Sequence, residues 1–228
     1  MLPLEQLAEF TLPDGTLLAL SRRGDAHYLH ADRRLILSSA TRRFDEALAQ
    51  TCAEACRRRK SPRILLGHLG LGFTLFSLLQ SLPSTARISV CEDVTPLVTW
   101  HKEHLFGEEI SRAMADPRVS LVSAPLLKFL RKKQTPGFDA VVLGLDEEVH
   151  PHSAARLRDP DAVFAAISCL REFGTLIYTS LVQEKEFAQS LVKMMPMQTE
   201  GFTIFLNPEK KKGPRQNILL ARPELMPS

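Results

Sequence analysis

The chain is poor in aromatic residues and cysteine, and it contains no apolar run that approaches the roughly 18 residues needed to cross a membrane. Its first residues, MLPLEQLAEF, include Glu5 and Glu9 and lack the basic start and apolar stretch of a signal peptide. Neither charge sign dominates, because 29 basic residues are set against 26 acidic ones. These absences predict a cytoplasmic protein with no membrane contact.

The sequence also lacks the spacing of a common metal site. Of Cys52, Cys56, Cys91 and Cys169, only the first two are close, and their spacing places them on one face of a helix. We expect buried, reduced cysteines, with a metal, disulfide or redox role as the alternatives. The remaining candidates are two histidine pairs without an obvious third ligand, His101 with His104 and His150 with His152. No metal is therefore expected.

The 228 residues, 44% of them hydrophobic, are enough for one domain with a small appendage. Residues 11–38 alternate short apolar runs with turn residues, which predicts an antiparallel β ribbon. Residues 43–59 contain no Gly or Pro and repeat apolar residues at helical spacing. Residues 1–60 are thus predicted to form an N-terminal β subdomain with a linking helix.

Beyond Pro62, short apolar runs alternate with longer helical stretches. The runs begin near Ile64, Ile88, Val119, Ala140 and Thr175, and the helices are predicted at 72–82, 95–105, 125–133, 160–171 and 184–194. Strands buried on both faces and separated by room for one helix are what parallel βαβ units require. Two further runs, near Phe202 and Asn217, predict a closing antiparallel hairpin. We therefore expect residues 61–228 to form a doubly wound α/β, Rossmann-like nucleoside-binding domain.

A glycine-rich turn, GHLGLG, joins the first of these strands to its helix. Gly67, Gly70 and Gly72 would let the backbone approach a ligand and point helix N-terminal amides at it. Glu92 lies 22 residues past Gly70 and is followed by Asp93, a placement that suits acceptance of hydrogen bonds from ribose hydroxyls. The alternative interpretation is a tight structural turn with a solvated acid.

Four segments carry a resemblance to a known family. RILLGHLGLGFTLFSLL, VCEDVTPLVTWHKEHL, DPRVSLVSAPLLKFL and FDAVVLGLD resemble, in order and spacing, motifs of the spermidine synthase family of aminopropyltransferases, especially its bacterial spermidine-synthase-like branch. The N-terminal ribbon, the helix RRFDEALAQ and residues 170–176 also match that plan. The resemblance implies an S-adenosylmethionine-dependent methyltransferase-type fold and a homodimer. It also implies S-adenosylmethionine or its decarboxylated form as co-substrate, and transfer of an aminopropyl group to a small amine.

Three positions depart from the family pattern. His68 replaces a glycine of the turn, Ser123 and Ala124 stand where the family has Gly-Asp, and Gly144 stands where its catalytic Asp falls. Asp146, with Glu147 beside it, is a substitute base, or else part of a solvated acidic turn. Asp45-Glu46 stands where relatives have a His-Glu pair that helps form the substrate pocket, so Glu46 is a candidate contact for the amine, or else an ordinary helix-surface charge.

Three functions remain open on this basis: a small-amine transferase, a methyltransferase on the same fold, and an inactive binding or interaction module. One basic cluster, residues 209–215, is predicted at a hairpin tip, and residues 57–60 form a second. Because charge runs at loop tips are usually solvated, we do not expect nucleic-acid binding.

Overall fold

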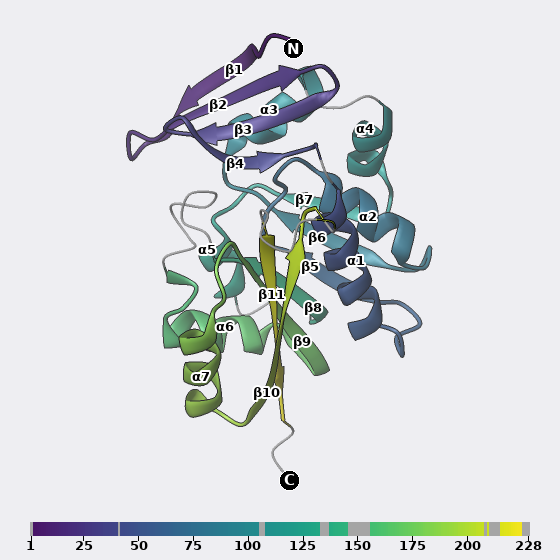
Figure 1. The fold of residues 1–228 in the computed structure, drawn as a ribbon. Coiled ribbons are helices and arrows are strands. Elements are labelled where there is room, and N and C mark those ends of the chain that lie inside the picture. The colour runs from purple at the N-terminus through teal and green to yellow at the C-terminus, as the bar shows by residue number, and fades with distance from the viewer. Residues whose placement is uncertain are drawn as a thin grey trace.

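The structure is a computed structural model that describes residues 2–40, 42–104, 108–132, 137–145, 156–207, 209 and 215–224. Its N-terminal part is an antiparallel sheet in the order β1-β2-β3-β4 (Figure 1). The strands are β1 (Glu5–Thr11), β2 (Leu17–Arg23), β3 (Ala26–Ala31) and β4 (Arg34–Ser38). The predicted ribbon is confirmed from β2 onward, whereas β1 was not predicted because it is an edge strand without a buried residue.

A second sheet forms the centre of the molecule. Its strands are β5 (Arg63–Leu66), β6 (Arg87–Cys91), β7 (Val119–Val122), β8 (Phe138–Gly144), β9 (Leu170–Ser180), β10 (Met197–Phe205) and β11 (Arg215–Pro223). The seven strands lie in the order β10-β11-β9-β8-β5-β6-β7. Strands β5 to β9 pair in parallel, and the predicted hairpin of β10 and β11 joins through the antiparallel pair β11–β9. The strand order reverses direction between β5 and β8, which is where doubly wound sheets bind their ligands.

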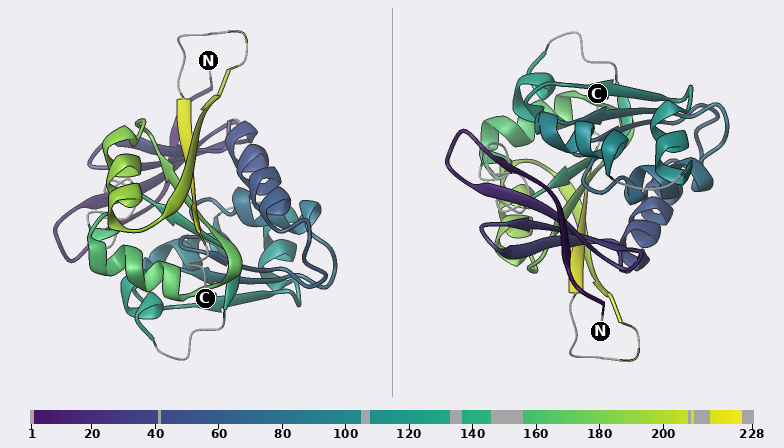
Figure 2. Two further views of the ribbon diagram at one scale, coloured as in Figure 1. Left: turned by 90° about the horizontal axis from the view of Figure 1, so that it is seen from below. Right: turned by 90° about the horizontal axis from the view of Figure 1, so that it is seen from above.

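Helices cover both faces of this sheet (Figure 2). Their bounds are α1 (Arg43–Ala55), α2 (Phe73–Ser81), α3 (Thr95–Glu103), α4 (Glu108–Ala115), α5 (Leu126–Leu130), α6 (Pro160–Ser168) and α7 (Lys185–Met194). On one face Leu48 of α1 and Leu75 of α2 pack with Val142 of β8. On the other face Val163 of α6 and Leu191 of α7 belong to a separate apolar cluster. The result is the layered α/β architecture that the sequence predicted.

Three helices differ from the expectation. Helix α5, expected over 125–133, begins at Leu126 and ends at Leu130. Helix α4 was not predicted, because its apolar face is short and is completed only by the sheets it packs against. The helix expected over 160–171 ends at Ser168, and β9 begins at Leu170, where Leu170 pairs with Phe138 of β8. Leu170 and Arg171, which periodicity assigned to the helix, therefore belong to β9, because β9 pairs with the buried strand β8.

The N-terminal sheet packs through its own apolar cluster. Leu20 of β2 and Leu29 of β3 are buried against Leu97 and Trp100 of α3. Helix α1, which follows the N-terminal sheet, packs against α2 and the central sheet through Cys52 and Cys56. All four cysteines are buried, as expected.

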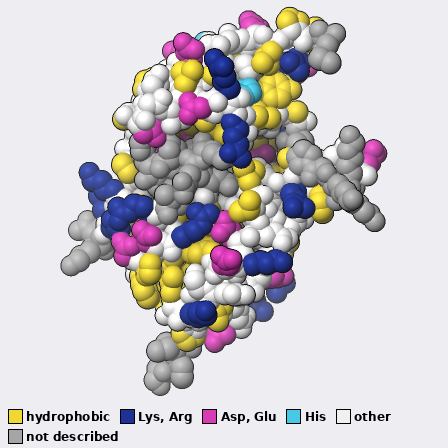
Figure 3. All heavy atoms as spheres, turned by 60° about the vertical axis from the view of Figure 1, so that its left-hand side comes forward, with side chains coloured by type: hydrophobic (Ala, Val, Ile, Leu, Met, Phe, Trp, Pro, Cys, Tyr) yellow, Lys and Arg dark blue, Asp and Glu magenta, His cyan; other side chains and the backbone are white. Residues whose placement is uncertain are grey.

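The described residues form neither a membrane-spanning helix nor, on the face drawn in Figure 3, a surface of one charge sign. No helix in the described ranges is long and apolar enough to span a membrane. On the face drawn in Figure 3, acidic and basic side chains are interspersed over the described surface. Within the first basic cluster, Arg57 pairs with Glu54 and Arg59 with Asp139. Most of the second cluster, residues 210–214, lies outside the described residues.

Candidate functional site

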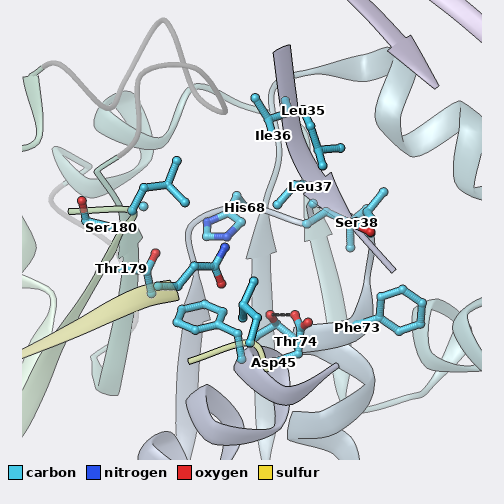
Figure 4. Close-up of a pocket in the computed structure, with 18 of the residues that line it drawn as sticks. Leu35, Ile36, Leu37, Ser38, Asp45, His68, Phe73, Thr74, Thr179 and Ser180 are labelled. Carbon is cyan, nitrogen blue, oxygen red and sulfur yellow. Dashed lines mark hydrogen bonds between the residues drawn. The ribbon is translucent and has the colours of Figure 1, made fainter. Parts of the chain in front are cut away.

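A cavity of 230 Å³ lies where β4, α1 and the glycine-rich turn meet the carboxyl ends of β8 and β9. Strand β4 of the N-terminal sheet forms one wall, and the start of β11 closes another. Its lining includes Leu35, Leu37, Phe44, Asp45, His68, Leu71, Thr74, Gly144, Thr179, Ser180, Leu181, Leu206, Arg215 and Gln216. Figure 4 shows the His68 ring near the centre of the labelled residues, with Leu35 and Ile36 above it, Thr179 and Ser180 to one side, and the Asp45–Thr74 pair below. The cavity wall combines apolar side chains with polar and charged ones.

Asp45 provides a carboxyl group at this cavity. The Thr74 hydroxyl donates a 2.6 Å hydrogen bond to Asp45 Oδ1 (Figure 4). Burial raises the pKa of Asp45 to about 6, although the bond from Thr74 opposes the rise. No Lys, Arg or His of the described chain lies within ion-pair distance of this carboxyl. Among the described residues, the site therefore holds a desolvated acid without a cation in ion-pair distance.

The adjacent Glu46, which was the sequence candidate, is exposed on α1 and is not part of the cavity wall. Helical spacing carries the signal that distinguishes the two acids. Asp45 lies three, four and seven residues before the buried Leu48, Ala49 and Cys52, whereas Glu46 is out of phase with them.

His68 lies in the cavity wall, within the turn where the family has glycine. Burial lowers the pKa of its imidazole to about 4, so the ring is neutral at pH 7. Figure 4 shows the ring near the centre of the group of lining side chains. The side chain therefore occupies volume beside the turn and adds no positive charge at neutral pH.

The glycines of the turn are required by contacts with the protein itself. A Cβ at Gly67 would lie 2.7 Å from the Val142 carbonyl oxygen of β8. At Gly72, whose φ is +83°, a Cβ would lie 2.7 Å from Ile110 of α4 and 3.1 Å from His101. Gly70 is also left-handed, with φ of +55°. Close packing against β8, α3 and α4 thus explains the glycines without a bound ligand.

The carboxylate of Glu92 stabilises this turn through hydrogen bonds. Its carboxyl oxygens accept hydrogen bonds from the backbone N–H groups of Leu69, at 3.0 Å, and Val94, at 2.9 Å. Burial raises the pKa of Glu92 to about 7, and the two N–H donors counteract part of that rise. The ring of His101 makes a further 2.8 Å hydrogen bond to the Gly70 carbonyl, and burial lowers the pKa of His101 to about 4. Both carboxyl oxygens of Glu92 therefore accept hydrogen bonds from backbone N–H groups of the chain itself.

A second cavity, of 410 Å³, lies at the carboxyl ends of β6 and β7. It contains the predicted residues Asp93, Ser123 and Ala124. The turn between β1 and β2 covers it, together with apolar side chains from α3 and the β7–α5 loop; these residues are Phe10, Leu12, Pro13, Val94, Pro96 and Pro125. An acid beside apolar side chains can accept hydrogen bonds from ribose hydroxyls while the apolar surface packs against a purine. Asp93 and the apolar lining of this cavity are compatible with an adenosine group.

The remaining sequence candidates divide between these places. Gly144 lines the first cavity at the end of β8, and Asp146 lies outside the described residues, as do His150 and His152. Among the described residues no cluster of three or more His, Cys, Asp or Glu side chains could hold a metal ion. The sequence reasoning missed Arg215 and Gln216, which reach the cavity from the closing hairpin. No local motif marks them, because only the sheet order brings them there.

Comparison with known proteins addresses the fold. No protein-family model and no curated protein sequence matches the chain. Matches among solved structures show that the seven-stranded sheet with its separate N-terminal sheet has a methyltransferase-type fold. One neighbour is precorrin-6y C5,15-methyltransferase from Geobacter metallireducens, with a TM-score of 0.56 and 13% identity over 78% of this chain and 87% of the neighbour.

The fold is, more specifically, spermidine-synthase-like. Spermidine synthase in complex with the transition state analogue AdoDATO matches with a TM-score of 0.75 and 15% identity, over 97% of this chain and 75% of that one. Spermidine synthase from Thermotoga maritima matches with a TM-score of 0.70 and 14% identity, over 97% and 73% of the two chains. The match includes the N-terminal sheet, because nearly the whole of this chain is covered.

Proposed function

We propose that this chain binds a small amine in the Asp45 cavity, beside an adenosine-containing sulfonium co-substrate, and transfers a group from the co-substrate to the amine. The observation that carries the proposal is the desolvated Asp45 carboxyl, which has the Thr74 hydroxyl but no described cation within ion-pair distance. An ammonium group would supply that missing charge, because a buried carboxylate is costly unless it is paired. The spermidine-synthase-like fold supports the same chemistry.

The co-substrate would be S-adenosylmethionine or its decarboxylated form. Asp93 would accept the ribose hydroxyls, and Ser123 and Ala124 would lie beside the base, in the cavity under the β1–β2 turn. When bound, a sulfonium supplies an electrophilic carbon to the attacking amine. The amine nitrogen would form a bond to that carbon as the carbon–sulfur bond breaks, and the sulfur would leave as a neutral thioether. Asp45 would hold the amine and accept a proton from it, a role that requires Asp45 to be ionised.

A second candidate is binding without transfer. Gly144 at the end of β8 provides no acid to the cavity, and Glu92 uses both oxygens on Leu69 and Val94. A site with these two features keeps amine and nucleoside recognition but has fewer groups for proton transfer. In this alternative the chain would pair with a second copy of itself or with an active relative.

The test is thermal stability at pH 7.5 with butylamine and other primary amines, and separately with methylthioadenosine. A ligand that binds only the folded chain adds about 2.7 kcal/mol at 100 times its dissociation constant. We expect the stabilisation by amines to be lost in Asp45→Asn and kept in Glu46→Gln, a matched change one residue away on the same helix. Absence of any stabilisation by amines in the wild-type chain would contradict the proposal.

Mass spectrometry of the amine after incubation with each co-substrate separates the candidate activities. Gain of an aminopropyl group supports transfer from decarboxylated S-adenosylmethionine, and gain of a methyl group supports the methyltransferase alternative. Stabilisation by amine and nucleoside with no change in the mass of the amine supports binding without transfer.

A further inference from the structure

The first cavity contains two opposite charges from distant parts of the chain. Asp45 lies near the start of α1, and Arg215 is the first residue of β11. Among the described lining residues, Asp45 is the only acid and Arg215 is the only Arg or Lys. His68 does not add to the charge at pH 7, because it is neutral there. The cavity is thus dipolar, with one group for a cation and one for an anion.

Arg215 is exposed, and its guanidinium has no carboxylate within ion-pair distance among the described residues. Arg222 on the same strand is different, because it lies 3.6 Å from Glu200 of β10. A guanidinium presents a planar set of donors that matches a carboxylate with two parallel hydrogen bonds. The charge at Arg215 is therefore available to a ligand.

The rest of the wall is unfavourable to a second ammonium group. Apart from Asp45 and Arg215, the described lining carries no charged side chain at pH 7; it combines apolar residues with the uncharged polar groups of Ser38, Thr179, Ser180 and Gln216. A diamine bound by one end at Asp45 would place its other ammonium among groups that carry no negative charge, or near Arg215. Both positions are costly, since one leaves a charge unpaired and the other brings like charges together.

We propose that the ligand of this cavity is an amino carboxylate, whose ammonium binds Asp45 and whose carboxylate binds Arg215, and not a diamine. This inference rests on the proposed binding of an amine at Asp45 and specifies the substrate class. An ammonium and a carboxylate joined by a short apolar segment are found in two sources. One is an amino acid as acceptor, and the other is the methionine portion of intact S-adenosylmethionine, which the decarboxylated form lacks.

The test uses three ligands of equal carbon length, which are 4-aminobutanoate, butylamine and 1,4-diaminobutane, titrated calorimetrically at pH 7.5 and fixed ionic strength. We expect 4-aminobutanoate to bind at least about ten-fold more tightly than 1,4-diaminobutane, the ratio that corresponds to loss of one charged hydrogen-bonded contact. Arg215→Gln should remove that advantage and leave butylamine binding unchanged. Arg222→Gln, on the same strand, should change neither.

The same titrations with S-adenosylmethionine and its decarboxylated form identify the source. S-adenosylmethionine could bind more tightly than its decarboxylated form, through Arg215, while 4-aminobutanoate does not bind. That result supports the proposal, with the co-substrate as the source of the amino carboxylate. Equal or tighter binding of 1,4-diaminobutane, or no effect of Arg215→Gln on any carboxylate, overturns the inference and leaves amine binding in place. Failure of all three amines to bind contradicts the proposed function itself, whether or not the nucleosides bind.

Discussion

The hydroxyl of Thr74, in the first turn of α2, donates to the carboxyl of Asp45, in the first turn of α1, at 2.6 Å. This bond joins the two helices at the wall of the cavity and favours the ionised form of Asp45. Other charges act on the same carboxyl: Glu46 raises its pKa and Arg42 lowers it. Arg215 and the neutral His68 line the same cavity.

Thr74→Val should raise the pKa of Asp45 above about 6, because valine keeps the shape of threonine and removes the donor. Amine binding should then require a higher pH, since the carboxyl must be ionised to hold an ammonium. Carbon-detected NMR titration of the Asp45 carboxyl measures the change directly. Thr99→Val, at an exposed position of α3, is the matched control and should leave the titration unchanged.

Glu92→Gln should change the pH dependence of stability. The pKa of Glu92 is about 7 in the folded chain, above its value in the unfolded chain, so the folded state binds the proton more tightly. The stabilisation from this group is present at low pH and is lost as pH rises to about 7. Compared with the wild type, the variant should therefore gain about 2 to 3 kcal/mol between pH 5 and pH 8.

Urea unfolding at both pH values measures this difference. Taking the difference between the two chains removes the opposite contribution of His68 and His101, whose lowered pKa values make the fold more stable as pH rises. A difference between the chains that does not vary with pH would mean that Glu92 is ionised in the folded chain throughout this range.

Gly72→Ala should destabilise the chain by more than Gly15→Ala. Both glycines have left-handed backbone angles, with φ of +83° and +91°, so both substitutions impose backbone strain of about 1 kcal/mol. Only at Gly72 would the new methyl group also meet Ile110 at 2.7 Å, whereas nothing lies within 4 Å of it at Gly15. We expect the difference between the two free energies of unfolding to be about 1 to 3 kcal/mol. Equal losses would show that α4 moves away without cost.

Asp139→Asn should be strongly destabilising. Asp139 of β8 is 1% exposed and lies 3.0 Å from Arg59 and 3.2 Å from Arg171, and its carboxyl also accepts a hydrogen bond from the Arg63 N–H at 2.8 Å. Removing one partner of a buried charge network costs about 3 to 5 kcal/mol.

The matched change is Asp161→Asn, which breaks an exposed pair with Arg131 and should cost under about 1 kcal/mol. Denaturant unfolding compares the two variants. A loss at Asp139 no larger than that at Asp161 would contradict a buried network joining the end of α1 to β5, β8 and β9.

The central fold could be predicted because its strands are buried on both faces. Val141 and Val142 lie in a strand with seven buried residues, and such a run reads as a strand wherever it occurs. Strand β1 could not be read in this way, because an exposed edge strand needs no apolar pattern. The resemblance to spermidine synthases is confirmed at the level of the fold.

The candidate site was less predictable, because side-chain direction and long-range contact decide it. Asp45 and Glu46 are neighbours in sequence, and only the phase of α1 separates them. Glu92 has the expected position after β6, yet its oxygens accept from Leu69 and Val94. Arg215 enters the cavity through the pairing of β11 with β9, which no local pattern specifies. The ligand roles of the predicted residues stay predictions.

The cavity wall draws on residues from Leu35 in β4 to Gln216 in β11. During synthesis, the N-terminal sheet and α1 emerge long before the hairpin strand that completes the wall. No ligand can be held between Asp45 and Arg215 until the residues of β11 have left the ribosome and β11 has paired with β9. Once held, such a ligand would link α1 to β11, and unfolding of either element would release it.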